Sequence, residues 1–203
     1  GVSSWVNQMI RAFPDIRFGI VFIGSRREDY GDMVYQLPEN VVHLETHFLY
    51  DFPPPPLVHG TPGDARAFDK SDALHELLRE PGKEAEAGDL IRELMPQLRE
   101  GGALSEDAFL YSKRAWDTIT SQYRQFCTDP SFTDYFWTIR IMHKPLWQLV
   151  RIADGLIPAK VYHTVSTGYA GFLGAMLRHR NGRPLLVSEH GIYTKERKID
   201  LFQ

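Results

Sequence analysis

Polar side chains crowd together directly after an apolar run near the end of the sequence. The run RPLLV, residues 183–187, is followed by SEHGIYTKER, which holds carboxylate, imidazole, phenol and basic groups within ten residues. Ligands of open parallel sheets bind beyond the carboxyl ends of the strands. If residues 183–189 form a buried strand, Glu189 and His190 lie at the mouth of a substrate site, and we predict that both contribute to it. The glycine that follows permits a close approach of backbone to ligand.

Other apolar runs end in polar residues too. Such ends occur at residues 24–26 (Gly-Ser-Arg), 45–47 (Glu-Thr-His) and 163–164 (His-Thr). In a parallel sheet the carboxyl ends of the strands meet at one edge. We therefore predict that His163 belongs to the same edge as His190.

Three residues of one candidate strand alternate in the pattern H-x-E-x-H. Alternation places His43, Glu45 and His47 on a single face of a strand. Imidazole and carboxylate groups on one face could ligate a metal ion. Histidines in strands also serve ordinary packing, and the pattern by itself leaves both interpretations open.

The sequence starts with Gly1, Val2, Ser3 and Ser4, directly before a helical pattern that runs to Phe13. The N–H groups and the positive dipole end of a helix N-terminus can bind a phosphate. A serine before a helix also serves as an ordinary N-cap. Because the sequence starts with Gly1 instead of Met, we expect a fragment of a longer protein.

The elements that would position these residues alternate between strand and helix at both ends of the sequence. Strands are predicted at residues 17–24, 40–49, 159–165 and 183–189, with a helix after Gly168 that is rich in small residues. Residues 68–153 have helical spacing instead, with two long helices, 105–126 and 132–150, the second bent at Pro145. The fold class predicted is α/β: one domain over residues 1–203 with a Rossmann-like parallel sheet and an inserted long helical hairpin.

The composition narrows the classes of function. With 203 residues and 43% hydrophobic content the chain can bury one real core. A net charge of −3 gives no electrostatic reason to bind nucleic acid. The lone Cys127 excludes an internal disulfide and suits a reducing compartment. No apolar run approaches the ~18 residues of a membrane span.

Four stretches together resemble one known family. They are GVSSWVNQMIRAFPDIRFGIVFIGSRREDYG, LPENVVHLETHF, YHTVSTGYAGFLGAML and SEHGIYTKERKIDL. They resemble the N-terminal domain of Pel-type exopolysaccharide glycosyltransferases, in retaining glycosyltransferase family 4. The resemblance implies a GT-B fold, in which two Rossmann-like domains face a cleft, and transfer from a UDP-sugar without a bound metal or other cofactor.

The resemblance also implies roles for individual residues. Gly1 to Ser4 match the end of the loop that touches the donor phosphates, and His190 matches a histidine near the donor and acceptor sugars. His163, Tyr193 and Arg197 are expected on the acceptor side, where Tyr193 could stack on a sugar and Arg197 or Lys195 could meet a phosphate. The partners expected are the UDP-sugar, a polysaccharide acceptor, a C-terminal donor domain, and inner-membrane synthase proteins that hold a cytoplasmic enzyme at the membrane.

Two alternatives stay open at this point. A metal-dependent hydrolase could be built on the histidine and glutamate residues of the strands: His43, Glu45, His47, His163 and His190. A non-catalytic scaffold could instead use the helical hairpin to dock a membrane synthase complex.

Overall fold

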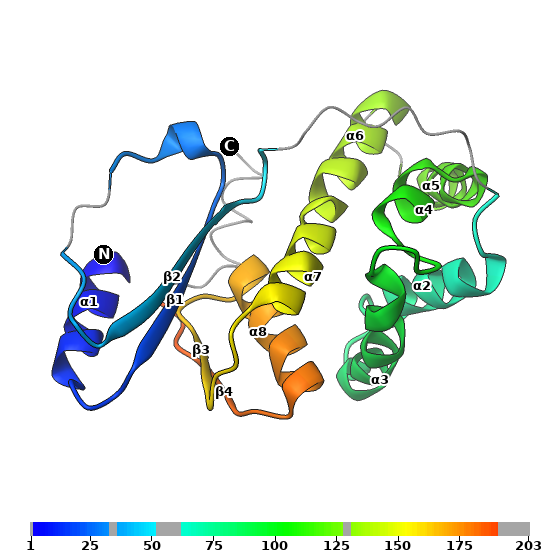
Figure 1. Ribbon diagram of the computed structural model, residues 1–203. Helices are drawn as coiled ribbons and strands as arrows, with labels where there is room; N and C mark the ends of the chain where they lie inside the picture. The colour runs from blue at the N-terminus through cyan, green and yellow to red at the C-terminus, as the bar shows by residue number, and fades with distance from the viewer. Residues whose placement is uncertain (1, 33–35, 52–61, 128–130, 191–203) are drawn as a thin grey trace. The chain divides into compact units, whose positions relative to one another are not determined.

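The computed structural model describes residues 2–32, 36–51, 62–127 and 131–190. It confirms the predicted α/β class, with several helices and short parallel strands in two small sheets (Figure 1). By Cα positions the chain divides into two compact units, one made of Gly1–Pro53 with Leu156–Gln203 and the other of Pro54–Gly155. Of the predicted site residues, Gly1, Tyr193 and Arg197 lie outside the described part.

The first unit, called here the strand unit, contains every described strand. Its elements are α1 (Val2–Ala12), β1 (Phe18–Gly24), the short 3-10 helix η1 (Arg27–Asp29), β2 (Val41–Phe48), β3 (Tyr162–Thr164), α8 (Gly168–Asn181) and β4 (Leu185–Val187). β1 pairs with β2 and β3 pairs with β4, both in parallel. The described strands thus form two two-stranded sheets, and the sheet predicted as continuous is divided.

The βαβ unit β3–α8–β4 was predicted from the sequence and is present. A β-carbon at Gly174 of α8 would lie 2.7 Å from Thr164 Cγ2 and 2.8 Å from a methyl carbon of Leu185. Glycine at this position therefore lets the helix lie directly on the two strands. β4 is shorter than predicted and is not buried, because Leu186 and Val187 are each more than half exposed.

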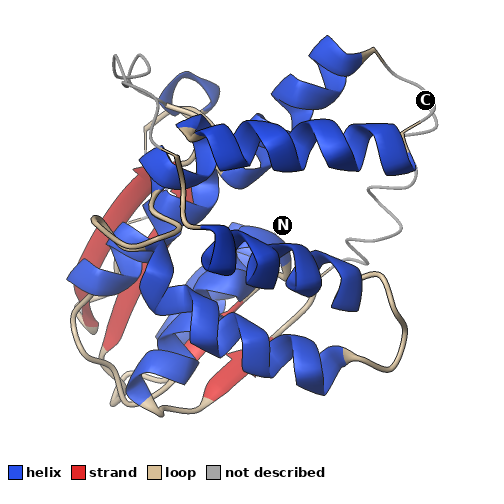
Figure 2. Cartoon of the chain, turned by 90° about the vertical axis from the view of Figure 1, so that its right-hand side faces the viewer, coloured by secondary structure: helices blue, strands red, loops and turns tan. Residues whose placement is uncertain are grey.

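The second unit, called here the helical unit, contains only helices in its described part (Figure 2). They are α2 (Ala65–Leu77), α3 (Glu84–Leu94), the 3-10 helix η2 (Met95–Leu98), α4 (Glu106–Tyr111), α5 (Lys113–Phe126), α6 (Phe132–His143) and α7 (Pro145–Gly155). Ala67, Phe68, Leu94 and Leu104 form a buried cluster at its core.

The two long helices predicted for this unit are wrong in detail, because each is divided. Ser112 adopts an extended backbone between α4 and α5, and its hydroxyl accepts a hydrogen bond from the Ala115 amide. Pro145 starts α7, since its ring nitrogen has no hydrogen to donate to the preceding turn. The two helices of the predicted hairpin still contact each other through α5 and α6, where the ring centroids of Tyr123 and Phe132 lie 5.2 Å apart.

Candidate functional site

Polar side chains meet at the carboxyl ends of β3 and β4. His163 in β3 lies opposite Leu186 of β4, and its Nε2 is 2.9 Å from the hydroxyl of Ser188. The Ser188 amide donates to the Thr164 carbonyl, which continues the strand pairing one residue beyond β4. The predicted convergence of the two strand ends is therefore present in the structure.

Helix α1 brings an aromatic ring to the same place. The indole of Trp5 lies 4.5 Å from the imidazole of His190 and 5.9 Å from that of His163, centroid to centroid, in edge-on arrangements. The C-terminal end of α1 is held by Asn40, whose amide donates to the carbonyls of Ile10, Phe13 and Ile16. Three segments far apart in the sequence thus supply one cluster, which we call the strand-end cluster: Trp5, His163, Thr167, Ser188, Glu189 and His190.

Glu189 reaches the start of α8. Its carboxylate accepts a hydrogen bond of 3.1 Å from the hydroxyl of Thr167, the residue that precedes the first turn of that helix. Thr167 gives α8 no side-chain cap of its own, so its hydroxyl is directed to the carboxylate. Glu189 therefore connects the end of β4 to the beginning of the helix that packs on it.

One buried oxygen at this edge has no partner. The hydroxyl of Thr164, the last residue of β3, is buried and makes no hydrogen bond within the described part of the chain. By contrast His163, Glu189 and His190 are exposed. The cluster thus offers imidazoles, a carboxylate, hydroxyls and an indole at the surface, a set that can hydrogen-bond sugar hydroxyls while the indole packs on the sugar ring.

The predicted phosphate-binding residues are only partly described. Ser3 and Ser4 lie inside the first turn of α1 and not before the helix as predicted, because the helix already starts at Val2. Gly1 falls outside the described residues together with Tyr193, Lys195 and Arg197. The cradle of backbone N–H groups for a diphosphate stays a prediction.

The H-x-E-x-H residues of β2 are engaged with one another. Glu45 accepts from both neighbours, with Oε1 2.6 Å from Nε2 of His43 and Oε2 2.9 Å from Nε2 of His47. These hydrogen bonds, from His47 first and His43 second, hold the pKa of Glu45 below its ordinary value. Within the described residues no group of three or more His, Cys, Asp or Glu side chains is placed to hold a metal ion. Both carboxylate oxygens of Glu45 are thus engaged by the two imidazoles of the same strand.

Sequence reasoning did not assign Ser188 and Thr167 to the site. Both stand next to residues that it did assign, Ser188 at the end of β4 and Thr167 in the turn between β3 and α8. Parallel sheets bind ligands at the turn that connects the end of a strand to the helix after it. That rule, applied to the turn as well as to the strand ends, would have included both.

Comparison with known proteins identifies the family to which this chain belongs. A family model described as "Domain of unknown function (DUF3492)" matches residues 1–203, while neither the curated proteins nor the solved structures gave a match. No helix in the described ranges is both long enough and apolar enough to span a bilayer. The chain belongs to the DUF3492 family, a family of N-terminal domains associated with glycosyltransferases.

Proposed function

We propose that this chain is the acceptor-side domain of a UDP-sugar-dependent, retaining glycosyltransferase that extends an exopolysaccharide of the Pel type, and that the whole enzyme is PelF or a close relative of it. Membership of a glycosyltransferase-associated family supports the reaction class. The sequence resemblance supports the Pel type, the UDP-linked donor and a transfer that needs no metal.

The observation that carries the proposal is the strand-end cluster. Trp5 from α1, His163 from β3 and His190 after β4 lie within ring-contact distance, with ring centroids 4.5 and 5.9 Å from the indole. An indole beside two imidazoles suits a sugar ring, whose C–H face packs on the aromatic ring while its hydroxyls hydrogen-bond to the imidazole nitrogens.

The chemical work then divides between two domains. In a retaining transfer the diphosphate leaves as positive charge develops on the sugar, so the enzyme must stabilise the phosphate and position the acceptor hydroxyl. We assign the second task to this chain: His190 and His163 orient the acceptor hydroxyls, Trp5 holds the ring, and Glu189 fixes the turn before α8. The backbone of Gly1 to Ser4 meets the donor phosphates, with Tyr193 and Arg197 beside the acceptor, and a C-terminal domain holds the nucleotide.

Release of UDP tests this division. The 203-residue chain, incubated with UDP-glucose or UDP-N-acetylglucosamine and an oligosaccharide acceptor, should release no UDP above background, because the donor domain is absent. The enzyme that contains both domains should release UDP in proportion to sugar transferred. Turnover by the isolated chain at a rate comparable with the two-domain enzyme would contradict the proposal.

A further inference from the structure

The helical unit contains a partly open cavity of about 270 Å³ that the proposed function leaves unused. This volume is near the lower end of the range for small-molecule sites, which suits a ligand of the size of one monosaccharide ring. Aromatic side chains form much of its wall: Phe109, Trp116, Tyr135 and Phe136. Such a largely apolar cavity with a few polar groups is typical of small-molecule sites.

Two histidines on the cavity wall present only acceptor nitrogens. Nδ1 of His75 is 2.7 Å from the Ser71 carbonyl, and Nδ1 of His143 is 2.7 Å from the Ile139 carbonyl. A carbonyl oxygen only accepts, so each Nδ1 must carry the hydrogen and donate it. In the neutral rings both Nε2 atoms are therefore acceptors, and they face each other at 3.4 Å.

When both rings are neutral, neither Nε2 atom can donate a hydrogen to the other. Burial, the largest effect, holds the pKa of His143 below its ordinary value and so favours the neutral ring, and Phe109 stacks on that ring at 5.5 Å. Two lone pairs at 3.4 Å repel unless a hydrogen lies between them or beside them. A hydroxyl or N–H group of a ligand in the cavity would supply that hydrogen.

A third acceptor on the wall is the carboxyl of Asp72. This carboxyl forms no hydrogen bond or ion pair with any residue that the structure describes. Partial burial raises the pKa of Asp72. Asp72 stands one helical turn before His75 on α2, so both side chains lie on the same face of that helix. Asp72 therefore adds an oxygen acceptor to the two imidazole nitrogens.

The cationic groups of the wall are already engaged. Arg79 donates to Gln122 Oε1 and lies over the ring of Phe126. Arg140 donates to the Leu110 carbonyl and lies over Tyr111. The wall carries charges of both signs, so an organic cation would meet two guanidinium groups and an anion would meet the Asp72 carboxyl. The wall therefore favours a neutral ligand rich in hydroxyl donors.

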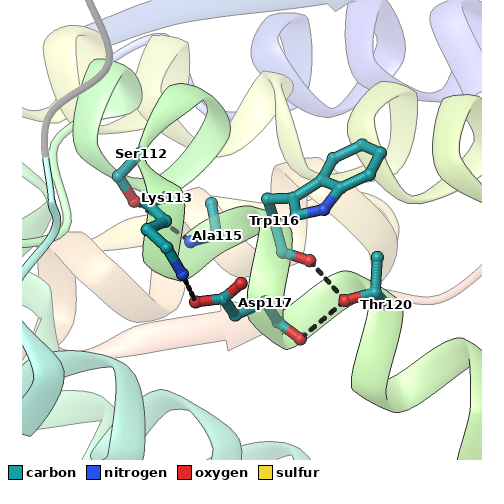
Figure 3. Close-up of polar contacts among 6 residues, drawn as sticks. All are labelled: Ser112, Lys113, Ala115, Trp116, Asp117 and Thr120. Atoms are coloured by element: carbon teal, nitrogen blue, oxygen red, sulfur yellow. Dashed lines mark hydrogen bonds and ion pairs between the residues drawn. The ribbon is translucent and has the colours of Figure 1, made fainter.

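The backbone that carries Trp116 is fixed at the start of α5. Figure 3 shows the Ser112 hydroxyl capping the Ala115 amide, the pair of Lys113 with Asp117, and the Thr120 hydroxyl donating to the Trp116 carbonyl at 2.8 Å. The Trp116 indole itself is half exposed. It therefore stands at the rim of the cavity as an aromatic face that a ligand can pack on.

We propose that this cavity binds one neutral sugar ring, whose hydroxyls donate to His75, His143 and Asp72 while its C–H face packs on Trp116. It is a second saccharide site, in a different unit from the strand-end cluster. The choice of a sugar over another neutral polyol rests on the proposed function.

Direct binding to the 203-residue chain tests this site without any transfer activity. The probes are methyl β-glucopyranoside, N-acetylglucosamine and cellobiose, with inorganic phosphate and tetramethylammonium as the charged comparisons. Saturation-transfer NMR should detect a sugar with a Kd on the order of millimolar and neither ion. Trp116→Ala should weaken sugar binding by roughly tenfold or more, the scale of losing a well-placed aromatic contact, and His75→Phe by roughly fivefold.

Matched variants show whether the sugar binds in the cavity or elsewhere on the chain. Trp137→Ala removes another half-exposed indole, one that does not line the cavity, and should leave the Kd within about twofold. Trp5→Ala removes the indole of the strand-end cluster, where the proposed function also places a sugar, so the binding that persists in Trp5→Ala belongs to the cavity. Melting curves of each variant show whether a loss of binding reflects unfolding.

Three results would overturn the cavity site. The first is that no sugar binds at about 50 mM, which is well above a millimolar Kd. The second is that phosphate or tetramethylammonium binds in place of sugar. The third is that Trp5→Ala abolishes sugar binding while Trp116→Ala leaves it unchanged. The third result would contradict the cavity site but would still favour the proposed function. If the two-domain enzyme transfers no sugar while the cavity still binds one, the proposed function is contradicted and the cavity site is not.

Discussion

At the residue scale, six of the seven histidines that the structure describes fall into three different environments. His163 and His190 are exposed and in contact with Trp5. His43 and His47 share the carboxylate of Glu45, and the half-buried His143 faces His75 on the cavity wall. The sequence predicted the first environment from strand-end position. The sequence could not predict the environment of His43 and His47, because the H-x-E-x-H spacing is the same whether the three side chains bind a metal or one another.

The hydrogen bonds to Glu45 predict a specific dependence of stability on pH. A carboxyl whose pKa is lower in the folded than in the unfolded protein stabilises the fold above its unfolded pKa, and this contribution is lost as pH falls through the folded value. Glu45→Gln should therefore lower the urea midpoint of unfolding at pH 7, and the difference from wild type should shrink as pH is lowered below the ordinary carboxyl value of 4.5.

The control is Glu39→Gln, at an exposed residue just before β2. It should leave the midpoint unchanged at every pH. A Glu45→Gln effect of constant size from pH 7 to pH 3 would show that the hydrogen bonds do not depend on the charge of the carboxylate.

At the scale of elements, the sequence predicted the strand–helix–strand order β3–α8–β4 because its glycines and apolar runs are local signals. It did not predict the division of the long helices. Helical spacing continues through residues 105–126, but Ser112 has an extended backbone and uses its hydroxyl to start a new helix. Whether a serine interrupts a helix in this way depends on tertiary packing, and Ser112 is almost fully buried.

The cap at Ser112 gives a prediction with an internal control. Ser112→Ala should cost about 1 kcal/mol of unfolding free energy, because the Ala115 amide loses its acceptor at the start of α5. Ser105 precedes α4 in the same way but forms no side-chain cap. Ser105→Ala should therefore cost clearly less, and denaturant unfolding of the two variants checks the difference. Equal losses would show that the cap hydrogen bond is not what stabilises α5.

At the scale of the whole molecule, the strand unit holds the strand-end cluster and the helical unit holds the cavity. The helical region predicted at residues 68–153 lies within the Pro54–Gly155 unit. The sequence could not reveal the cavity, because its wall combines residues from α2, α4, α5 and α6 whose meeting depends on packing. It also predicted one sheet where the described strands form two.

Because the chain divides into two compact units, we expect a substitution in the core of one unit to destabilise mainly that unit. Phe68 is 1% exposed and stacks on Phe109, so Phe68→Ala should cost about 3–5 kcal/mol within the helical unit. Hydrogen exchange should show lost amide protection in α2 to α7, with protection in β1, β2 and α8 retained. Equal loss of protection in both units would show that they unfold as one.

The proposed role of the strand-end cluster depends above all on His190, and the rate of sugar transfer by the two-domain enzyme decides it. His190→Ala should lower that rate by roughly 100-fold or more, the scale of losing one positioned polar group, while the melting curve stays unchanged because the side chain is exposed. His179→Ala, an exposed histidine at the end of α8, should transfer at the wild-type rate. A His190→Ala enzyme that transfers sugar as fast as the His179→Ala enzyme, or that unfolds, would show that the cluster is not the acceptor site.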